Sequence, residues 1–521
     1  MSDEAYEIAK HSINEALLHQ RKFLQLRGLT TLPPEIGQLL GLVALDLSSN
    51  PLGALPPQIG NLSSLRKLSL TSSRLTALPA ELAALSQLEV LELNGFVGDA
   101  GNLFTTFPPE ILKLKALKKL SVAGNQSLTS LPGEIDSLDA LEVLILSGTA
   151  LTTLPARIGG LGKLQTLEAQ CTLTTLPPEI GQLQKLQTLD LRNNPLRSLP
   201  SEIGGLSSLT VLNVNNIQLT ALPTTIGQLQ KLQTLDLGNN QLASLPSELF
   251  ALSSLTVLKA NGNKLTSLPP EIGNLRALTV LNLSGGNAIT TLPAEIGRLK
   301  ALDDLNVIAL PLSAIPHEFA GLSSLRILGM GLVGGTIPHE ISKLSSLRVF
   351  NLAGGTATVL PPEIGQLLTL ETLQITANNL TALPAEIGQL RALETLELRQ
   401  IRNLTALPAA IGNLGALKTL TILQASKIVA LPAEIGNLGA LKALTVQSSQ
   451  ITALPAEIGN LSALKILDLT RNKLTALPKD LGRLTKLETL IVLNNPLTVP
   501  PPAVIAQGTK AILEFLRNLP G

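Results

Sequence analysis

The sequence predicts an α/β solenoid, a curved horseshoe with a parallel β-sheet on its inner side and short helices or irregular segments on its convex side. Three observations predict this fold class. An apolar residue followed by proline recurs from Leu32-Pro33 to Val499-Pro500 over twenty intervals, which gives about 20–21 units of about 23 residues. Apolar residues make up 45% of the 521 residues but aromatic residues only 2%, so leucine must fill the core. A single cysteine excludes an internal disulfide framework, so packing alone has to stabilise the fold.

The first half of each unit predicts a strand and a turn. The segment Leu186–Leu199 reads LQTLDLRNNPLRSL, and its L-x-L alternation places successive side chains on opposite faces of a short strand. The asparagine that follows can pair its amide with backbone groups where the chain leaves the strand, so we expect a ladder of asparagines along the solenoid. The ladder residues are Asn50, Asn194, Asn240, Asn263, Asn472 and Asn495.

The second half of each unit follows the pattern L-P-x-E-I-G. Proline suits the first turn of a short helix, glutamate lies near the positive end of the helix dipole, and the glycine is expected to permit a left-handed exit. Together with L-x-x-L-x-L-x-x-N-x-L and the repeat length, this is the pattern of leucine-rich repeats. Stacked units bring the glutamates into one column. We favour the interpretation that each glutamate interacts with the dipole of its own helix over the alternative that the column docks a basic partner. The column is formed by Glu35, Glu179, Glu202, Glu271, Glu295, Glu363, Glu386, Glu434 and Glu457.

Both ends of the array need caps, because a single repeat cannot bury its own leucines. Residues 1–22 have helical apolar spacing and are expected to form an N-terminal capping helix. The solenoid is expected to cover residues 23–500. Residues 501–521 are expected to form a C-terminal capping helix, which Thr509 can cap.

Two segments depart from the period. The interval around residues 94–107 has 29 residues and is rich in glycine and phenylalanine, which predicts a tolerated loop or a protruding contact loop anchored by Phe96 and Phe104. Residues 308–335 lack the ladder asparagine, which predicts a repacked turn or an exposed apolar patch around Leu310 and Leu332.

Charge and motifs exclude several function classes. Lys and Arg total 39 against 38 for Asp and Glu, so the chain has no field that would steer it to nucleic acid. The polar start and the absence of a long apolar run predict no membrane insertion and a cytoplasmic location. His317 and His339 share one repeat slot without an enclosing pocket, so no metal is expected, and Cys171 takes a ladder position. No P-loop or Ser-His-Asp set is found, so neither a cofactor nor an enzymatic activity is expected.

The inner sheet is the candidate binding surface, because it is concave and rigid. Its outward side chains in the centre of the chain are polar and of mixed sign, without a Trp or Tyr anchor, which predicts a large polar contact with a protein. The candidate partner-binding residues are Asp190, Arg192, Asn213, Asn215, Asp236, Lys259, Asn282 and Asn306.

The unit LPPEIGQLQKLQTLDLRNNPLRSL, residues 176–199, resembles the intracellular Ras-group leucine-rich repeats. These occur in Ras-pathway scaffolds, in plant intracellular Ras-group proteins and in the repeat domains of Roco proteins. The tail at residues 500–519 also resembles the segment that joins Roco repeats to their GTPase domain. Because no P-loop is found in the sequence, we do not expect GTP hydrolysis to carry over from this resemblance. The resemblance implies a monomeric scaffold for protein partners in signal transduction, with small GTPases or their effectors as candidates.

Two other functions remain open at this level. One is a regulatory arm, or relict, of a Roco-type GTPase system that acts with an enzyme on another chain. The other is an extracellular recognition or adhesion protein, against which the polar start of the chain speaks.

Overall fold

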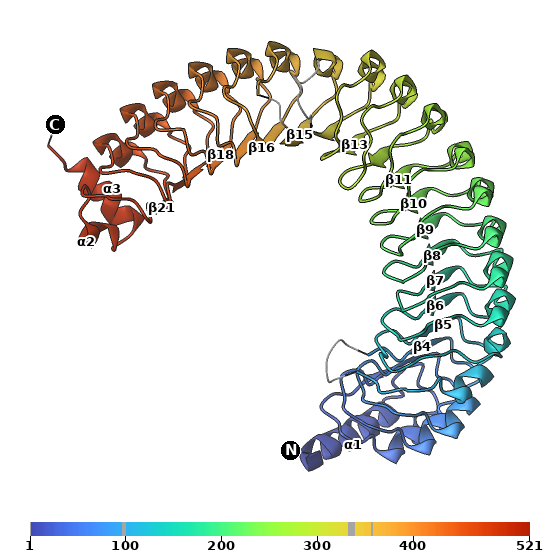
Figure 1. The fold of residues 1–521 in the computed structure, drawn as a ribbon. Coiled ribbons are helices and arrows are strands. Elements are labelled where there is room, and N and C mark those ends of the chain that lie inside the picture. Colours follow the sequence, from blue (N-terminus) through green and yellow to red (C-terminus); the bar gives the residue numbers. More distant parts are fainter. Residues whose placement is uncertain (1, 96–100, 332–338, 356–357, 521) are drawn as a thin grey trace. The chain divides into compact units, whose positions relative to one another are not determined.

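The computed structural model describes residues 2–95, 101–331, 339–355 and 358–520. The chain divides into two compact units, Met1–Leu258 (unit 1) and Lys259–Gly521 (unit 2). Within each unit, parallel strands line the concave side and short 3₁₀ helices line the convex side (Figure 1). The predicted solenoid of parallel strands is therefore confirmed, and the convex segments are 3₁₀ rather than α-helical.

Unit 1 begins with helix α1 (Ser2–Leu18). Its strands are β1 (Phe23–Gln25), β2 (Ala44–Asp46), β3 (Lys67–Ser69), β4 (Val90–Glu92), β5 (Lys119–Ser121), β6 (Val143–Ile145), β7 (Thr166–Glu168), β8 (Thr188–Asp190), β9 (Val211–Asn213) and β10 (Thr234–Asp236), and β11 (Val257–Lys259) lies at the boundary. Its 3₁₀ helices are η1 (Pro34–Gln38), η2 (Pro57–Asn61), η3 (Ala80–Ala84), η4 (Pro109–Lys113), η5 (Ile135–Ser137), η6 (Ala156–Gly160), η7 (Pro178–Gln182), η8 (Ser201–Gly205), η9 (Thr224–Gln228) and η10 (Ser247–Ala251).

Unit 2 repeats this plan and ends in two helices, α2 (Pro502–Ile505) and α3 (Thr509–Arg517). Its strands are β12 (Val280–Asn282), β13 (Asp304–Val307), β14 (Ile327–Met330), β15 (Val349–Gly355), β16 (Thr372–Asn378), β17 (Thr395–Arg399), β18 (Thr419–Leu423), β19 (Ala443–Gln447), β20 (Ile466–Asp468) and β21 (Thr489–Ile491). Its 3₁₀ helices are η11 (Pro270–Asn274), η12 (Ala294–Arg298), η13 (His317–Gly321), η14 (His339–Lys343), η15 (Pro362–Gln366), η16 (Ala385–Gln389), η17 (Ala409–Asn413), η18 (Ala433–Asn437), η19 (Ala456–Asn460) and η20 (Lys479–Arg483).

The strands pair in one register throughout. In unit 1 each strand from β1 to β10 is parallel to the next, and corresponding leucines such as Leu189 and Leu212 face each other. The same holds from β12 to β21 in unit 2. These leucines are buried between the strands and the 3₁₀ helices. The core is thus a stack of leucine layers, which needs no large rings.

The predicted asparagine ladder is present, and Asn194 shows its geometry. Its Nδ2 donates to the carbonyl oxygens of Ala169 (2.7 Å) and Leu191 (2.6 Å). Its Oδ1 accepts from the backbone N–H groups of Cys171 (3.1 Å) and Leu173 (2.8 Å). Each ladder asparagine therefore joins the turn of its own repeat to that of the preceding repeat.

Two neighbouring rungs of the ladder use smaller side chains. The Thr149 hydroxyl donates to the Leu146 carbonyl (2.7 Å), and the Cys171 thiol donates to the same carbonyl (3.2 Å). Burial raises the pKa of the Cys171 thiol. This cysteine therefore replaces an asparagine in the ladder and stays in its thiol form.

The glycine that recurs in the L-P-x-E-I-G pattern has a different cause from the predicted one. Gly181 does not adopt a left-handed conformation, but a Cβ on it would lie 2.2 Å from the carbonyl oxygen of Glu202 in the next repeat. Gly297 makes the same approach to Glu318, at 2.1 Å. The prediction of a left-handed exit at these glycines is wrong, because glycine is needed where successive 3₁₀ helices touch.

The enlarged interval at residues 94–107 retains the ladder. Asn102 takes the ladder position, and its Nδ2 donates to the carbonyl oxygens of Leu70 and Leu93, both at 2.9 Å. Phe104 is 1% exposed, so it belongs to the core and is not a contact anchor. The other candidate anchor, Phe96, lies outside the described residues.

The second irregular segment is also packed. Leu310 occupies the position of the ladder asparagine and is completely buried. The expectation that it contributes to an exposed apolar patch is therefore wrong, and the rest of that proposed patch, around Leu332, lies outside the residues that the structure describes. Among the described residues, no helix has both the length and the apolar character needed to cross a bilayer.

The two ends of the chain carry helices on the terminal repeats. In α1, Ala9, Ile13 and Ala16 are buried, and the Lys10 Nζ lies 3.1 Å from the Glu35 carboxylate of η1. In α3, Ile512 and Leu516 are buried. The domain limits at residues 22/23 and 500/501 stay predictions.

Thr509 has a different role from the predicted cap. Helix α3 begins at Thr509, its cap residue is Gly508, and the Thr509 hydroxyl accepts a hydrogen bond from the Leu490 backbone N–H (2.9 Å). The side chain therefore ties α3 to the edge of β21.

Candidate functional site

Five of the candidate partner-binding residues lie on the concave side of unit 1. On β8, Asp190 accepts a hydrogen bond from the Arg192 backbone N–H (3.1 Å) and forms an ion pair with the Arg192 guanidinium (3.0 Å). With its amide oxygen turned toward that guanidinium, Gln170 accepts two further hydrogen bonds, from Nε (2.7 Å) and Nη2 (3.0 Å). Arg192 is therefore held from two sides.

The next two repeats continue this polar row. The Asn213 side-chain oxygen accepts from the Asn215 backbone N–H (3.1 Å), and the Asn215 amide donates to the Asp236 carboxylate (3.1 Å). Asp236 also accepts from the Gly238 backbone N–H (2.9 Å). The structure thus links these predicted residues of unit 1 into two hydrogen-bonded groups, Asp190 with Arg192 and Asn213 with Asn215 and Asp236.

The remaining three predicted residues belong to unit 2. Lys259 ends β11, and Asn282 ends β12. The Asn282 side-chain oxygen accepts from the Ser284 backbone N–H (3.0 Å), and that of Asn306 on β13 accepts from the Ile308 backbone N–H (3.1 Å). Whether any of the eight residues contacts a partner stays a prediction.

These contacts show that the Asp and Asn residues of the strands help to shape the turns that follow. An Asp or Asn side chain that accepts from the N–H two residues ahead forms an Asx turn, which bends the backbone. Asp190, Asn213, Asp236, Asn282 and Asn306 all do so. Sequence reasoning counted them as binding residues because it could not distinguish an outward polar side chain from one that folds back on its own turn.

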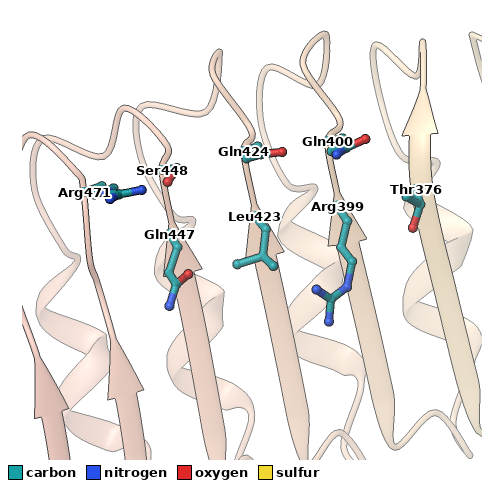
Figure 2. A pocket seen from close by; sticks show the side chains of 8 residues that line it. All are labelled: Thr376, Arg399, Gln400, Leu423, Gln424, Gln447, Ser448 and Arg471. Atoms are coloured by element: carbon teal, nitrogen blue, oxygen red, sulfur yellow. The ribbon is translucent and has the colours of Figure 1, made fainter. Parts of the chain in front are cut away.

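A hollow on the concave side lies elsewhere, on β16 to β20 of unit 2. Its volume is about 340 Å³, and five successive repeats contribute to it. Figure 2 shows two rows of side chains, one from the ends of the strands and one from the turns that follow. The lining residues are Thr376, Arg399, Gln400, Leu423, Gln424, Gln447, Ser448 and Arg471.

The lower row follows from strand register. Arg399 lies opposite Leu423, and Leu423 lies opposite Gln447, on three adjacent strands. Parallel strands are about 4.8 Å apart, so the hollow offers one side chain at each such step. Leu423 gives this row an apolar centre between two polar neighbours (Figure 2).

The upper row consists of residues in left-handed conformation. Gln400, Gln424, Ser448 and Arg471 have φ values between 52° and 57°. This conformation turns the chain away from the strand. The side-chain amides of Gln400 and Gln424 are exposed and make no hydrogen bond within the described part of the chain, whereas the backbone N–H groups of these residues donate to Leu423 and Gln447. The side-chain amides can therefore donate to and accept from a ligand.

The hollow is accompanied by longer strands and by changes at two positions of the repeat. Strands β17, β18 and β19 each have five residues, where all the strands of unit 1 from β1 to β10 have three. At the position that corresponds to Asp190 in β8, these three strands carry Glu397, Thr421 and Thr445 instead of Asp or Asn. No Asx turn therefore bends the backbone there. At the ladder position they carry the buried residues Ile401, Ala425 and Ser449. The repeats of β6 and β7 show the same joint loss (Ile145 with Thr149, Glu168 with Cys171), so the signal in the sequence that could have located the site is its occurrence in three successive repeats.

Charged groups at the hollow are only partly neutralised. Arg399 Nε donates to the Glu397 carboxylate (2.9 Å), and Gln447 Nε2 donates to the Asp468 carboxylate (2.7 Å). The exposed Arg471 guanidinium has no ion pair among the described residues. The hollow can therefore hold an amide-bearing or anionic group beside an apolar contact.

No metal-binding set is present among the residues that the structure describes. That part of the chain contains no group of three or more His, Cys, Asp or Glu side chains that could hold a metal ion. His317 and His339 are exposed and each lies beside the next glutamate, Glu318 at 3.1 Å and Glu340 at 3.6 Å. These side chains are placed to form hydrogen bonds and ion pairs.

The concave side of β13 carries one carboxylate with a perturbed pKa. Burial raises the pKa of Asp304, which lies between Val280 and Ile327, and the charge of Asp303 raises it further. The folded state thus binds the proton more tightly than the unfolded chain. Asp304 therefore costs stability as pH rises from the ordinary carboxyl range, about 4, through its higher folded pKa.

Replacing Asp304 with Asn should remove this cost. We expect Asp304→Asn to be more stable than the parent at pH 7 and to approach it at pH 4, with the urea midpoint as the measurement. The difference between the two proteins isolates Asp304 from other carboxylates. Equal midpoints at both pH values would contradict the assignment.

Comparisons with known proteins agree with the geometry. The family model described as a leucine-rich repeat region matches residues 212–288, 334–446 and 431–507, and related repeat models match residues 184–229 and 41–62. No curated protein sequence gave a significant match.

Several solved structures resemble the chain. A leucine-rich repeat protein of Leptospira interrogans is 31% identical, with 91% of this chain and 94% of that chain covered and a TM-score of 0.52. The plant peptide hormone receptor RGFR1 in complex with RGF2 is 28% identical, with 92% and 84% covered and a TM-score of 0.57. The ectodomain of the Arabidopsis receptor kinase HAESA with an IDA peptide hormone is 25% identical, with 90% and 84% covered and a TM-score of 0.55.

Proposed function

This chain belongs to the leucine-rich repeat proteins, and from that membership we propose that it is a non-enzymatic protein-binding scaffold whose hollow on β16 to β20 receives an extended segment of its partner. The observation that carries the proposal is the hollow itself. It presents exposed amides, an apolar centre and arginine at steps of one strand. An extended polypeptide offers groups of the same kinds along its length.

The hollow suits this task because two of its lining residues, Gln400 and Gln424, have side chains that form no hydrogen bond within the described part of the chain. Gln400 and Gln424 take no part in the ladder or in an Asx turn, so their amides are available without cost to the fold. Leu423 supplies an apolar contact that a partner can bury. Similar chains support the proposal that an extended segment binds here, since the structures of RGFR1 and HAESA were both solved with peptide hormones.

The test is affinity capture by the full chain from a lysate of its source cells, with proteins identified by mass spectrometry. We expect a partner that Leu423→Arg no longer captures, because a charged side chain would replace the apolar centre. The matched control is Arg192→Glu with Lys259→Glu, which changes the predicted central row and should retain the partner. With purified partner, titration should show at least about a tenfold loss of affinity for Leu423→Arg.

Other results would redirect or overturn the proposal. A partner lost only with the Arg192 and Lys259 changes would place binding on the central row. A partner kept by all variants would exclude both surfaces. Circular dichroism of each variant must match that of the parent, so that loss of fold is not taken for loss of binding.

We place this scaffold in the cytoplasm, in signal transduction linked to small GTPases. The support is the resemblance of residues 176–199 to the Ras-group repeats. Direct binding to a panel of purified small GTPases in their GTP and GDP states tests this placement. Absence of binding to every member would remove the GTPase link while leaving the hollow untouched.

A second candidate function is recognition of a peptide outside the cell. It is favoured by the likeness to the HAESA ectodomain with its bound hormone. Fractionation of the source cells separates the two candidates, because the cytoplasmic scaffold must be recovered with the soluble contents of the cell.

A further inference from the structure

A cluster of six charged side chains lies on the concave side of unit 1, on β3, β4 and β5 and just before them. We call it the β3–β5 cluster. Two glutamates on or before the central strand lie between four cations on or before the outer strands. The members are Arg66, Lys67, Glu89, Glu92, Lys118 and Lys119.

Each glutamate of the cluster is shared by two cations. Glu89 accepts from Arg66 and from Lys118, the latter at 2.9 Å. Glu92 lies 2.8 Å from the Lys119 ammonium and 3.6 Å from that of Lys67. Since each carboxylate offsets one charge, each group of three keeps one positive charge, and the cluster keeps two.

The cations of the cluster are more exposed to solvent than its glutamates. The four cations are 36–55% exposed, whereas Glu89 is 25% and Glu92 19% exposed. Hydrogen bonds from Lys118 and Arg66 lower the pKa of Glu89. Burial alone would raise the pKa of Glu92, but hydrogen bonds from Lys119 and Ser69 hold it below its usual range. The carboxylates are thus fixed, charged and covered, while the cations face solvent.

The cations retain binding capacity. A lysine ammonium has three donors and an arginine guanidinium five, so one internal carboxylate does not saturate them. Lys67 and Lys119 lie two strands apart, or about 10 Å, on either side of Glu92. Incoming carboxylates can therefore pair with the cations of β3 and with those of β5 without displacing the internal glutamates between them.

We propose that the β3–β5 cluster is a docking surface for an acidic polypeptide segment. Its net positive charge lies on the concave side of unit 1, which a flat membrane cannot reach. Nucleic acid fits it poorly, because a continuous row of phosphates would meet Glu89 and Glu92, and none of the six residues of the cluster is an aromatic residue on which bases could stack. Discrete carboxylates on a flexible chain can seat over the cations and avoid the glutamates. This surface is independent of the hollow on β16 to β20.

The test uses the full chain and a fluorescein-labelled peptide of eight glutamates, with binding followed by fluorescence anisotropy. We expect binding at about 20 mM salt that weakens steeply by about 200 mM. The double variant Lys67→Gln with Lys119→Gln should lower the affinity about tenfold or more, because it removes the exposed charges on both sides of Glu92. The matched control, Lys442→Gln with Lys465→Gln, removes two lysines of unit 2 and should bind as the parent does.

A second variant is expected to raise the affinity, which misfolding could not do. Glu92→Gln removes an internal negative charge and should tighten binding several-fold. Equal affinities for the parent and the Lys67/Lys119 variant would overturn the proposal. So would weaker binding by Glu92→Gln, or equally tight binding of a single-stranded DNA octamer.

Discussion

Asn194→Leu should destabilise the protein by about 3 kcal/mol or more. The leucine fills the space but leaves the carbonyls of Ala169 and Leu191 and the N–H groups of Cys171 and Leu173 without their partner. A buried polar group without a partner costs about 1–3 kcal/mol, and Asn194 is only 2% exposed, so water cannot substitute freely. Guanidinium unfolding followed by circular dichroism measures the loss.

The control for this experiment is the preceding residue. Asn193 is exposed and has a left-handed backbone (φ 61°), so Asn193→Gly keeps the conformation and removes only a surface amide with its one exposed hydrogen bond, from the Asn216 side chain (2.9 Å). We expect a change within about 0.5 kcal/mol. Since stability in repeat proteins is local, hydrogen exchange of residues 169–194 should rise in Asn194→Leu before that of distant repeats. Comparable unfolding of both variants would show that the ladder contributes little.

Gly181→Ala should cost about 1–3 kcal/mol, although alanine favours helical structure. The added methyl group would lie 2.2 Å from the Glu202 carbonyl oxygen and 2.9 Å from its carbon, both of them backbone atoms of the next repeat. The clash can be relieved only if η7 and η8 separate, which would loosen the leucine layer beneath them. Thermal or denaturant unfolding detects this loss.

Gly162→Ala is the matched control in the neighbouring repeat. A Cβ at Gly162 meets nothing within 4 Å, and its backbone is not left-handed. We expect this variant to be as stable as the parent or slightly more stable, because alanine restricts the unfolded chain. Similar destabilisation by both substitutions would mean that loss of flexibility, and not close approach, explains the glycine column.

The repeat itself was predictable, because its period depends on local rules. The alternation around Leu189 requires a strand with one buried face, and Asn194 follows it at the point where the backbone groups need partners. These rules hold for any neighbour, so one repeat contains the information for its own layer.

Contacts between repeats were not predictable in the same way. Gly181 has two explanations in sequence, a left-handed φ or a close approach, and only the position of Glu202 in the next repeat decides between them. The hollow was missed because it results from residues absent at two positions over three repeats, and each absence alone is unremarkable. The predicted row from Asp190 to Asn306 was chosen by outward direction, which does not reveal that these side chains accept from their own turns.

The absence of Asx turns in β17 to β19 also affects how this surface can change over generations. Where Asp190 or Asn213 lies, a substitution that improves a contact also removes a turn, so affinity and stability compete. At Leu423 the two properties are separate, whereas Gln400 and Gln424 can change only to residues that accept a left-handed backbone. Libraries randomised at Leu423 should keep most of their members folded, and partner choice can drift there without selection for compensating changes in the leucine layers.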